Sequence, residues 1–268
     1  MITGFIDQKG DHMLGYESIG SGRQGVIVLH DWLCDTSTWD SVRLFLNTDA
    51  FSWVFADMRG YGKSLELKGT YTIEETAADV IALADHLGWN RFVVVGHSMS
   101  TLVALHVAQT AASRIEKVVL VCPVPPRGMG ADDAMIAALQ GVAAGDDVHR
   151  AQAVKYTVGN RLCDGWIRYK VAQWRATSSP DAVRGYIFPF ARDGVPNPQA
   201  MVSAPLLAVT GEQDDVPMRS DGVRGFYSPI CSNLTIAPIV ECGHYPMQET
   251  PPHLATLIER FLLPPESE

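Results

Sequence analysis

Short apolar runs alternate with amphipathic segments along most of the chain. Runs of about four apolar residues bounded by polar or glycine-containing segments are typical of parallel strands that are covered on both faces. Strands of this kind are predicted at residues 26–29, 53–56, 92–95, 118–121 and 206–209, with a shorter one at 234–236. Helices are predicted at residues 72–88, 99–111 and 252–263. The alternation predicts an α/β fold, a mostly parallel, doubly wound sheet with helices on both faces.

The first twenty residues alternate more loosely between apolar and polar positions. This pattern favours a hairpin of residues 3–8 with residues 12–19. The first long helix has a clearer start signal, because Thr72 can accept a hydrogen bond from the backbone N–H of Glu75 while the Glu75 side chain reaches back. We therefore expect a capping box at the start of this helix.

The pattern changes between residues 124 and 200. Three prolines precede an Ala-rich, helical stretch at residues 131–176, in which no strand is evident. The strand pattern returns only afterwards, so a helical segment interrupts one α/β domain. We expect residues 1–123 and 201–268 to form the core and residues 124–200 to form a helical cap inserted between its two parts.

Composition and charge narrow the class of protein. The 268 residues are 47% hydrophobic and 19% charged, with a mean hydropathy of +0.04, which supports a large core and excludes intrinsic disorder. The net charge of −9 repels phosphate backbones and anionic lipids, so nucleic acid and membranes are not expected as partners. No apolar run approaches the ~18 residues of a membrane span, and the N-terminal segment does not resemble a secretory signal. We therefore expect a cytoplasmic protein.

The cysteines and histidines do not form a metal-binding motif. The five cysteines are widely scattered, with no Cys-x-x-Cys and no histidine at zinc spacing, so reduced thiols are expected. No two histidines lie four residues apart with an intervening acid, as a metalloprotease helix requires. The sequence implies neither a metal nor an organic cofactor.

One serine lies where a strand, a tight turn and a helix are predicted to meet. The apolar run at residues 92–95 leads directly into Gly-His-Ser-Met-Ser at residues 96–100, and a helix follows. A serine at such a corner is lifted clear of the sheet, while the first backbone N–H groups of the helix stay free for a bound group. Small flanking residues are needed because larger side chains would collide with the adjacent strand or helix. Ser98 is therefore a candidate nucleophile.

This segment resembles the Gly-x-Ser-x-Gly nucleophile elbow of the α/β-hydrolase family, with Ser100 in place of the second glycine. The change adds only a hydroxymethyl group, so we expect an intact elbow with slightly adjusted helix packing. A nucleophilic serine needs a base and an acid to orient it, and the order in the family is Ser, acid, His. Asp214, rather than its neighbour Asp215, matches the position of the acid, and His244 lies in a Gly-His loop before the last helix. The resemblance implies a triad of Ser98, Asp214 and His244.

The resemblance also implies two backbone N–H groups that would bind an oxyanion. One belongs to Met99, and the other belongs to Trp32, in the loop after the strand at residues 26–29. Asp31 stands where the family usually has glycine. A carboxylate facing an oxyanion ~6 Å away would cost about 3 kcal/mol at an effective dielectric constant near 20. We therefore expect Asp31 to point away from Ser98, whereas a carboxylate directed at Ser98 would favour proton-transfer chemistry.

These features together predict a serine hydrolase that cleaves a small, largely apolar carboxylic ester or lactone through an acyl-serine intermediate. Trp32, Trp166, Tyr169 and Trp174 are candidates to line an apolar substrate pocket, and the three cap aromatics fit the interior of the cap equally well. Other chemistries of the same scaffold stay open: carbon–carbon bond hydrolysis, perhydrolysis, and cofactor-free dioxygenase or lyase reactions that use the histidine alone. A ligand receptor without turnover is a further alternative, which the complete triad disfavours. The expected partner is a small-molecule substrate, and the oligomeric state stays open.

Overall fold

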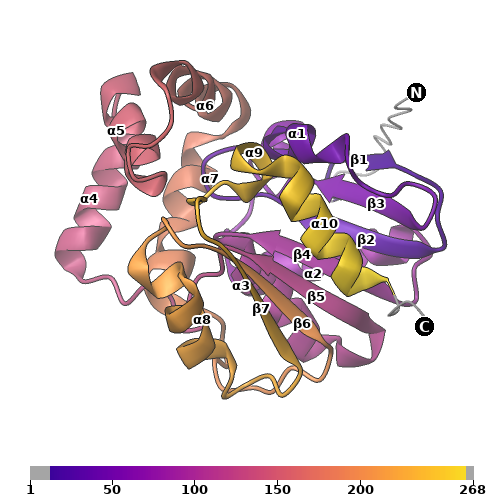
Figure 1. Ribbon diagram of the computed structural model, residues 1–268. Coiled ribbons are helices and arrows are strands. Elements are labelled where there is room, and N and C mark those ends of the chain that lie inside the picture. Colours follow the sequence, from indigo (N-terminus) through magenta and orange to yellow (C-terminus); the bar gives the residue numbers. More distant parts are fainter. Residues whose placement is uncertain (1–12, 264–268) are drawn as a thin grey trace.

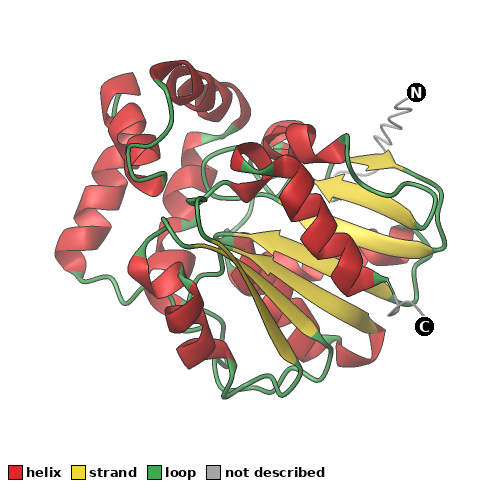
Figure 2. Ribbon diagram, viewed as in Figure 1, coloured by secondary structure: helices red, strands yellow, loops and turns green. Residues whose placement is uncertain are grey.

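The computed structural model describes residues 13–263, which are built around a single seven-stranded sheet (Figure 1, Figure 2). The strand order is β1-β3-β2-β4-β5-β6-β7; β1 is antiparallel to β3, and all other neighbouring pairs are parallel. The strands are β1 (Tyr16–Ile19), β2 (Gln24–Leu29), β3 (Phe51–Ala56), β4 (Phe92–His97), β5 (Ile115–Val121), β6 (Leu206–Gly211) and β7 (Leu234–Ile239). The mostly parallel, doubly wound α/β architecture is confirmed.

The central strand β4 shows why the apolar runs form the interior of the sheet. It pairs with β2 on one side and β5 on the other, and the side chains from Phe92 to Val95 are fully buried on both faces. Each such side chain contributes about 1.5–3 kcal/mol by leaving water. Continuous apolar sequence is therefore required where helices cover both faces of a parallel strand.

At the N-terminal edge of the sheet, β1 pairs with β3. Tyr16 lies opposite Ala56 and Ile19 lies opposite Trp53, so this strand extends the sheet in the antiparallel direction. The predicted hairpin partner at residues 3–8 lies outside the described residues. Within residues 13–263, the contact that orders the edge strand is therefore the one with β3.

Helices cover both faces of the sheet. Helices α2 (Ile73–His86) and α3 (Ser100–Thr110) pack against each other behind it in Figure 1, and α1 (Asp40–Arg43) and α10 (Pro251–Leu262) lie in front. Helix α8 (Ser220–Tyr227) packs against β6 and β7, and the short helix α9 (Pro246–Glu249) directly precedes α10. The helices predicted at residues 72–88, 99–111 and 252–263 correspond to α2, α3 and α10.

The start of α2 differs in one detail from the predicted capping box. The Thr72 hydroxyl accepts a hydrogen bond from the backbone N–H of Glu75 as expected. The Glu75 carboxylate does not return to Thr72; instead it accepts from the backbone N–H groups of Thr70 and Tyr71, at 2.8 Å each. Tyr71, directly before Thr72, has a positive φ of 58°.

Four helices fall between β5 and β6 and gather beyond the carboxyl ends of the strands (Figure 1). They are α4 (Asp133–Ala144), α5 (Asp147–Thr157), α6 (Asp164–Thr177) and α7 (Pro180–Gly185). All four lie within the segment that was expected to form the cap, residues 124–200. The carboxyl ends of parallel strands are the usual place for a ligand site, and here the cap helices enclose it.

Candidate active site

Ser98 occupies the sharp turn between β4 and α3. Its φ is +55°, a left-handed value that costs about 1–3 kcal/mol for a residue other than glycine. The turn is held by a hydrogen bond from the Ser98 N–H to the carbonyl of Val121 and by another from the Thr101 N–H to the carbonyl of Ser98, both 2.9 Å long. Gly96 is required on the strand side, because a Cβ there would lie 2.5 Å from the backbone oxygen of Ser100.

The hydroxyl of Ser100 contributes a contact that the sequence did not reveal. It accepts a hydrogen bond from the backbone N–H of His97 at 2.9 Å and lies 3.1 Å from the His97 carbonyl, to which it donates. Both residues are fully buried. The residue that replaces the second glycine of the family motif therefore closes the elbow with its own side chain.

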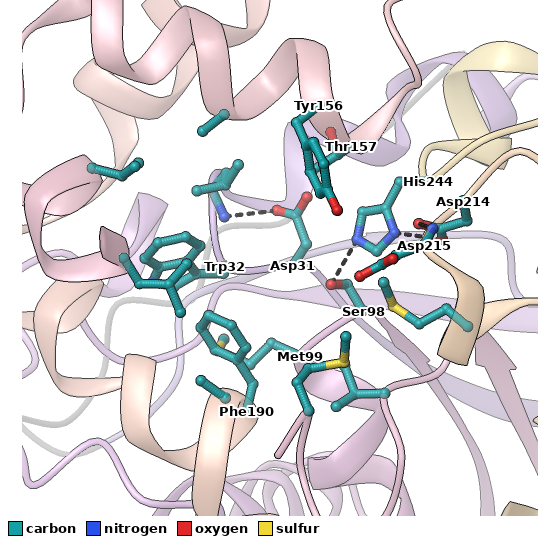
Figure 3. A pocket seen from close by; sticks show the side chains of 18 of the residues that line it. Asp31, Trp32, Ser98, Met99, Tyr156, Thr157, Phe190, Asp214, Asp215 and His244 are labelled. Atoms are coloured by element: carbon teal, nitrogen blue, oxygen red, sulfur yellow. Dashed lines mark hydrogen bonds and ion pairs between the residues drawn. The ribbon is translucent and has the colours of Figure 1, made fainter. Parts of the chain in front are cut away.

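The structure brings Ser98, Asp214 and His244 into direct contact. The Nε2 atom of His244 lies 2.8 Å from the Ser98 Oγ, and its Nδ1 atom lies 2.7 Å from the Asp214 Oδ2 (Figure 3). Burial alone would lower the pKa of His244, but the negative charge and hydrogen bond of Asp214 raise it above its usual value. Asp215 forms no hydrogen bond with the ring; its N–H donates to Asp214 Oδ1 at 2.7 Å. The imidazole can thus accept a proton from Ser98 while Asp214 stabilises the resulting imidazolium.

Two loops must approach closely for this contact to form. Asp214 follows β6 and His244 follows β7, and the two loops meet at Gly211 and Gly243. A Cβ at Gly211 would lie 2.0 Å from the carbonyl oxygen of Gly243, so only glycine fits at the end of β6. The glycines beside the acid and the base therefore make room for the approach of the two loops.

Two further residues, Glu249 and His97, fix the loop that carries His244. The sequence did not predict a role for Glu249 at the site, and it predicted only packing for His97. The Glu249 carboxylate accepts hydrogen bonds from the N–H groups of Gly243 and Tyr245, at 3.0 Å each, and forms an ion pair with Arg161 of the cap. His97, expected beneath the elbow, is fully buried there, and its Nε2 lies 2.7 Å from the His244 carbonyl. A glutamate five residues after the histidine, just before the predicted last helix, was the available signal for Glu249.

The two expected oxyanion donors are free to bind. Among residues 13–263, neither the backbone N–H of Met99 nor that of Trp32 has a hydrogen-bond acceptor. Both residues line the same cavity as Ser98. The Trp32 carbonyl accepts from the Tyr61 hydroxyl at 2.8 Å, and its indole N–H donates to the carbonyl of Val183 in α7 at 2.8 Å. These contacts hold the Trp32 backbone between core and cap.

Asp31 is buried beside this loop and does not point at the candidate nucleophile. Its Oδ1 accepts from the Leu33 N–H at 3.1 Å and from the Cys34 thiol at 2.9 Å. Its Oδ2 has no hydrogen-bond partner within the described part of the chain and lies 3.9 Å from the Nδ1 of His97. Figure 3 shows the carboxylate turned away from the Ser98 hydroxyl, in agreement with the expected orientation.

A cavity of about 580 Å³ opens above Ser98. Most of its surface is apolar, and Tyr156 of α5, a largely exposed side chain, also lines it (Figure 3). The apolar lining side chains from the elbow, the cap and the loop after β6 include Met99, Met129, Met135, Leu139, Val142, Phe190 and Met218. A cavity of this size and character suits a small organic molecule.

Of the four aromatic residues predicted to line the pocket, Trp32 lines the cavity above Ser98, and the structure does not bring the other three to it. Trp174 is buried behind Trp32, with ring centroids 5.8 Å apart. Trp166 packs on Tyr245 and donates a hydrogen bond to Gln248 at 3.0 Å. Tyr169 is half exposed on the same helix, α6. The aromatic side chains of α6 pack against the core or lie exposed to solvent. The cap's contribution to the cavity lining therefore comes from α4, α5 and the segment after α7.

One cluster has the residue types of a metal site, but most of its donor atoms already have hydrogen-bond partners, and only the Nδ1 of His97 has none among the described residues. The nearest donor atoms of His97, Cys122 and His244 all lie within 4.8 Å of one another. Both ring nitrogens of His244 are hydrogen-bonded, and the Cys122 thiol lies 3.6 Å from the Gly243 carbonyl, to which it donates. Burial raises the pKa of the Cys122 thiol well above its usual value, which opposes the thiolate form that metals bind. The cluster therefore fits the packing beneath the triad rather than an ion.

Within residues 13–263, no helix combines the length and the apolar character needed to cross a membrane.

Comparison with known proteins identifies the family. A family model described as the alpha/beta hydrolase fold matches residues 26–215. A non-heme haloperoxidase from Rhodococcus erythropolis is 38% identical over 46% of this chain and 44% of its own length, and a bifunctional esterase/perhydrolase from Acinetobacter calcoaceticus is 32% identical over 46% and 45%. The matches thus span less than half the length of these two relatives. An esterase from Exiguobacterium antarcticum has the same fold, with a TM-score of 0.83 at 18% identity over 97% of this chain and 99% of its own. Because the family model spans most of the sequence, the chain belongs to the α/β hydrolase fold family.

Proposed function

We propose that the protein is a serine hydrolase that cleaves a small, largely apolar carboxylic ester or lactone. The observation that carries this proposal is the continuous hydrogen-bonded chain from Asp214 through His244 to Ser98. A hydrogen-bonded triad of this kind makes a serine nucleophilic at neutral pH, because the imidazole accepts the serine proton as the new bond forms. The apolar cavity above Ser98 favours an uncharged acyl group.

The reaction proceeds in two steps. Ser98 attacks the carbonyl carbon while His244 takes the hydroxyl proton, and the backbone N–H groups of Trp32 and Met99 bind the oxyanion. His244 then gives the proton to the leaving alcohol, which leaves an acyl group on Ser98. Water attacks this acyl group with His244 again as the base. The bond to the Ser98 Oγ breaks, His244 returns the proton to that oxygen, and the carboxylic acid departs.

Covalent labelling tests the proposal most directly. A fluorophosphonate should form an adduct on Ser98 that mass spectrometry locates, and a series of p-nitrophenyl esters of increasing acyl length should be hydrolysed. Ser98→Ala and His244→Ala should abolish both signals, whereas the matched control His253→Ala, an exposed position on α10, should retain them. No labelling, together with turnover that survives Ser98→Ala, would contradict the acyl-serine mechanism and favour chemistry that uses His244 alone.

Perhydrolysis is a second candidate, favoured by the similarity to the bifunctional esterase/perhydrolase from Acinetobacter calcoaceticus. In that reaction hydrogen peroxide replaces water in the second step, so that the acyl group leaves Ser98 as a peracid. Peracid formed from an ester in the presence of hydrogen peroxide should be lost in Ser98→Ala. Turnover of a carbon–carbon substrate such as a diketone, with none of any ester, would favour carbon–carbon hydrolysis instead. Tight binding of a small molecule without turnover would favour a receptor.

A further inference from the structure

A lysine of the cap is buried directly beneath the loop that carries the expected oxyanion donor. Lys170, on α6, is fully buried. Its ammonium group donates to the Gln173 side chain at 2.8 Å, to the Cys34 thiol at 3.1 Å and to the Thr38 hydroxyl at 3.4 Å. It also lies 4.5 Å from the centroid of the Tyr245 ring. Such an environment is unusual for lysine, which is rarely buried without an anion nearby.

The anion that compensates this charge is Asp31, and Cys34 connects the two. The Cys34 sulfur accepts from Lys170 and donates to the Asp31 Oδ1. Burial alone would raise the pKa of Asp31, but the Lys170 ammonium keeps it below its usual value, so the carboxylate is ionised. Burial and the charge of Asp31 raise the pKa of the Cys34 thiol, which keeps it protonated and able to donate. Within residues 13–263 no carboxylate lies within 4 Å of the Lys170 ammonium.

The same carboxylate sets the backbone of the loop. Asp31 Oδ1 accepts from the Leu33 N–H, which closes a turn around Trp32. The His30 ring completes the arrangement: its Nε2 accepts from the Met58 N–H at 3.0 Å, so its Nδ1 donates to the Asp31 carbonyl at 2.7 Å. The Trp32 N–H lies inside this turn and is left without a partner among the described residues.

We propose that Lys170 is a positioning residue for the oxyanion site, acting through Cys34 on the Asp31 carboxylate and thereby on the turn that presents the Trp32 N–H. The ammonium also offsets the negative field of Asp31, which would otherwise oppose the charge that develops on the substrate oxygen. Because Lys170 belongs to the cap and Asp31 to the core, the oxyanion site is complete only when α6 is seated against residues 31–38. This inference rests on the proposed ester hydrolysis.

A double-mutant cycle tests the coupling. Lys170→Met should lower kcat for p-nitrophenyl acetate at least about tenfold while KM changes less than about threefold, because an oxyanion donor acts mainly in the transition state. In the Asp31→Asn background the same substitution should lower kcat less than about threefold, because the charge that Lys170 offsets is gone. Lys155→Met is the matched control: Lys155 is a partly exposed cap lysine paired with Asp164 at 3.0 Å, and kcat should stay unchanged.

A second pair of variants keeps the test decisive if Lys170→Met does not fold. Cys34→Ser keeps a donor and an acceptor between Lys170 and Asp31 and should retain kcat within about threefold, whereas Cys34→Val breaks the connection and should lose about tenfold. Equal losses in these two variants, or a Lys170→Met effect as large with Asp31→Asn as without it, would overturn the proposal.

The wild-type protein separates this inference from the proposed function. Hydrolysis and Ser98 labelling in the wild type, with Lys170→Met within about twofold of it, would reject the positioning role and leave the function standing. Absence of both wild-type signals would reject the function. The charge coupling would then be measured as the change in Tm across the same cycle, where additive effects of Lys170→Met and Asp31→Asn would contradict it.

Discussion

Replacing Ser100 by glycine restores the family's elbow motif, yet it should make this protein less stable. In the wild type the Ser100 hydroxyl is hydrogen-bonded to both the N–H and the carbonyl of His97, in a fully buried environment. Glycine leaves the His97 N–H without its acceptor, and water has no access to replace it. The residue that the family motif has at this position should therefore be less favourable here than serine.

The size of the effect follows from these contacts. A buried N–H that loses its acceptor costs about 1–3 kcal/mol. Glycine in the first turn of a helix costs up to about 1 kcal/mol more through backbone freedom. The total of about 1–4 kcal/mol should lower Tm by about 2–16 °C, because each kcal/mol shifts a domain of this size by about 2–4 °C.

Calorimetry and circular dichroism of the purified variants measure the change. Ser100→Ala is the control, because it loses the same hydroxyl but keeps the Cβ and should unfold between Ser100→Gly and the wild type. The fluorophosphonate reactivity of Ser98 reports whether the elbow keeps its geometry. A Ser100→Gly protein that unfolds at or above the wild-type temperature would show that the hydroxyl does not stabilise the turn.

Three further predictions concern the triad. Asp214→Asn should lower kcat by about 10³–10⁴-fold, since the amide cannot stabilise the imidazolium, while Asp215→Asn should stay close to the wild type in the same ester assay. Only neutral His244 can accept the serine proton, and its pKa is raised above 6.5. The value of kcat/KM should therefore fall as the pH drops through that raised pKa. A pH profile without this acidic limb would contradict the role of His244 as the base. Glu249→Gln should lower Tm by about 4–10 °C, because the amide nitrogen of glutamine would face one of the two backbone N–H groups beside His244. An unchanged Tm would show that these hydrogen bonds contribute little to stability.

The sequence predicted those features whose signal is local. Apolar runs located the inner strands, and the turn at Ser98 followed from a strand that leads directly into a helix. Asp214 and His244 were assigned through the resemblance to the α/β-hydrolase family. Their positions agree with it, because each lies in a loop after a strand and parallel strands bring such loops to the same edge of the sheet. The contacts among the three side chains then depend on glycines in the two loops that the sequence also shows.

The cap aromatics could not be placed in the same way. Trp166, Tyr169 and Trp174 all lie on α6, and a helix alone does not indicate which of its sides will meet the cavity. In the structure α6 packs toward residues 32–38 and Tyr245, while α4 and α5 face Ser98. The lining therefore depends on how the cap helices pack against one another and on the core, which is long-range information.

The two departures from the family pattern show the same difference between local and distant compensation. Ser100 replaces a glycine and satisfies a backbone group three residues away, so neighbouring sequence suffices to account for it. Asp31 replaces another glycine, and its charge is balanced by a lysine on a cap helix that looks like an ordinary surface residue in the sequence. If Lys170 acts on the oxyanion site only through the Asp31 carboxylate, Lys170 should no longer affect catalysis once Asp31 is replaced by glycine. Lys170→Met should then leave kcat nearly unchanged in an Asp31→Gly protein, although the same substitution lowers kcat in the wild type.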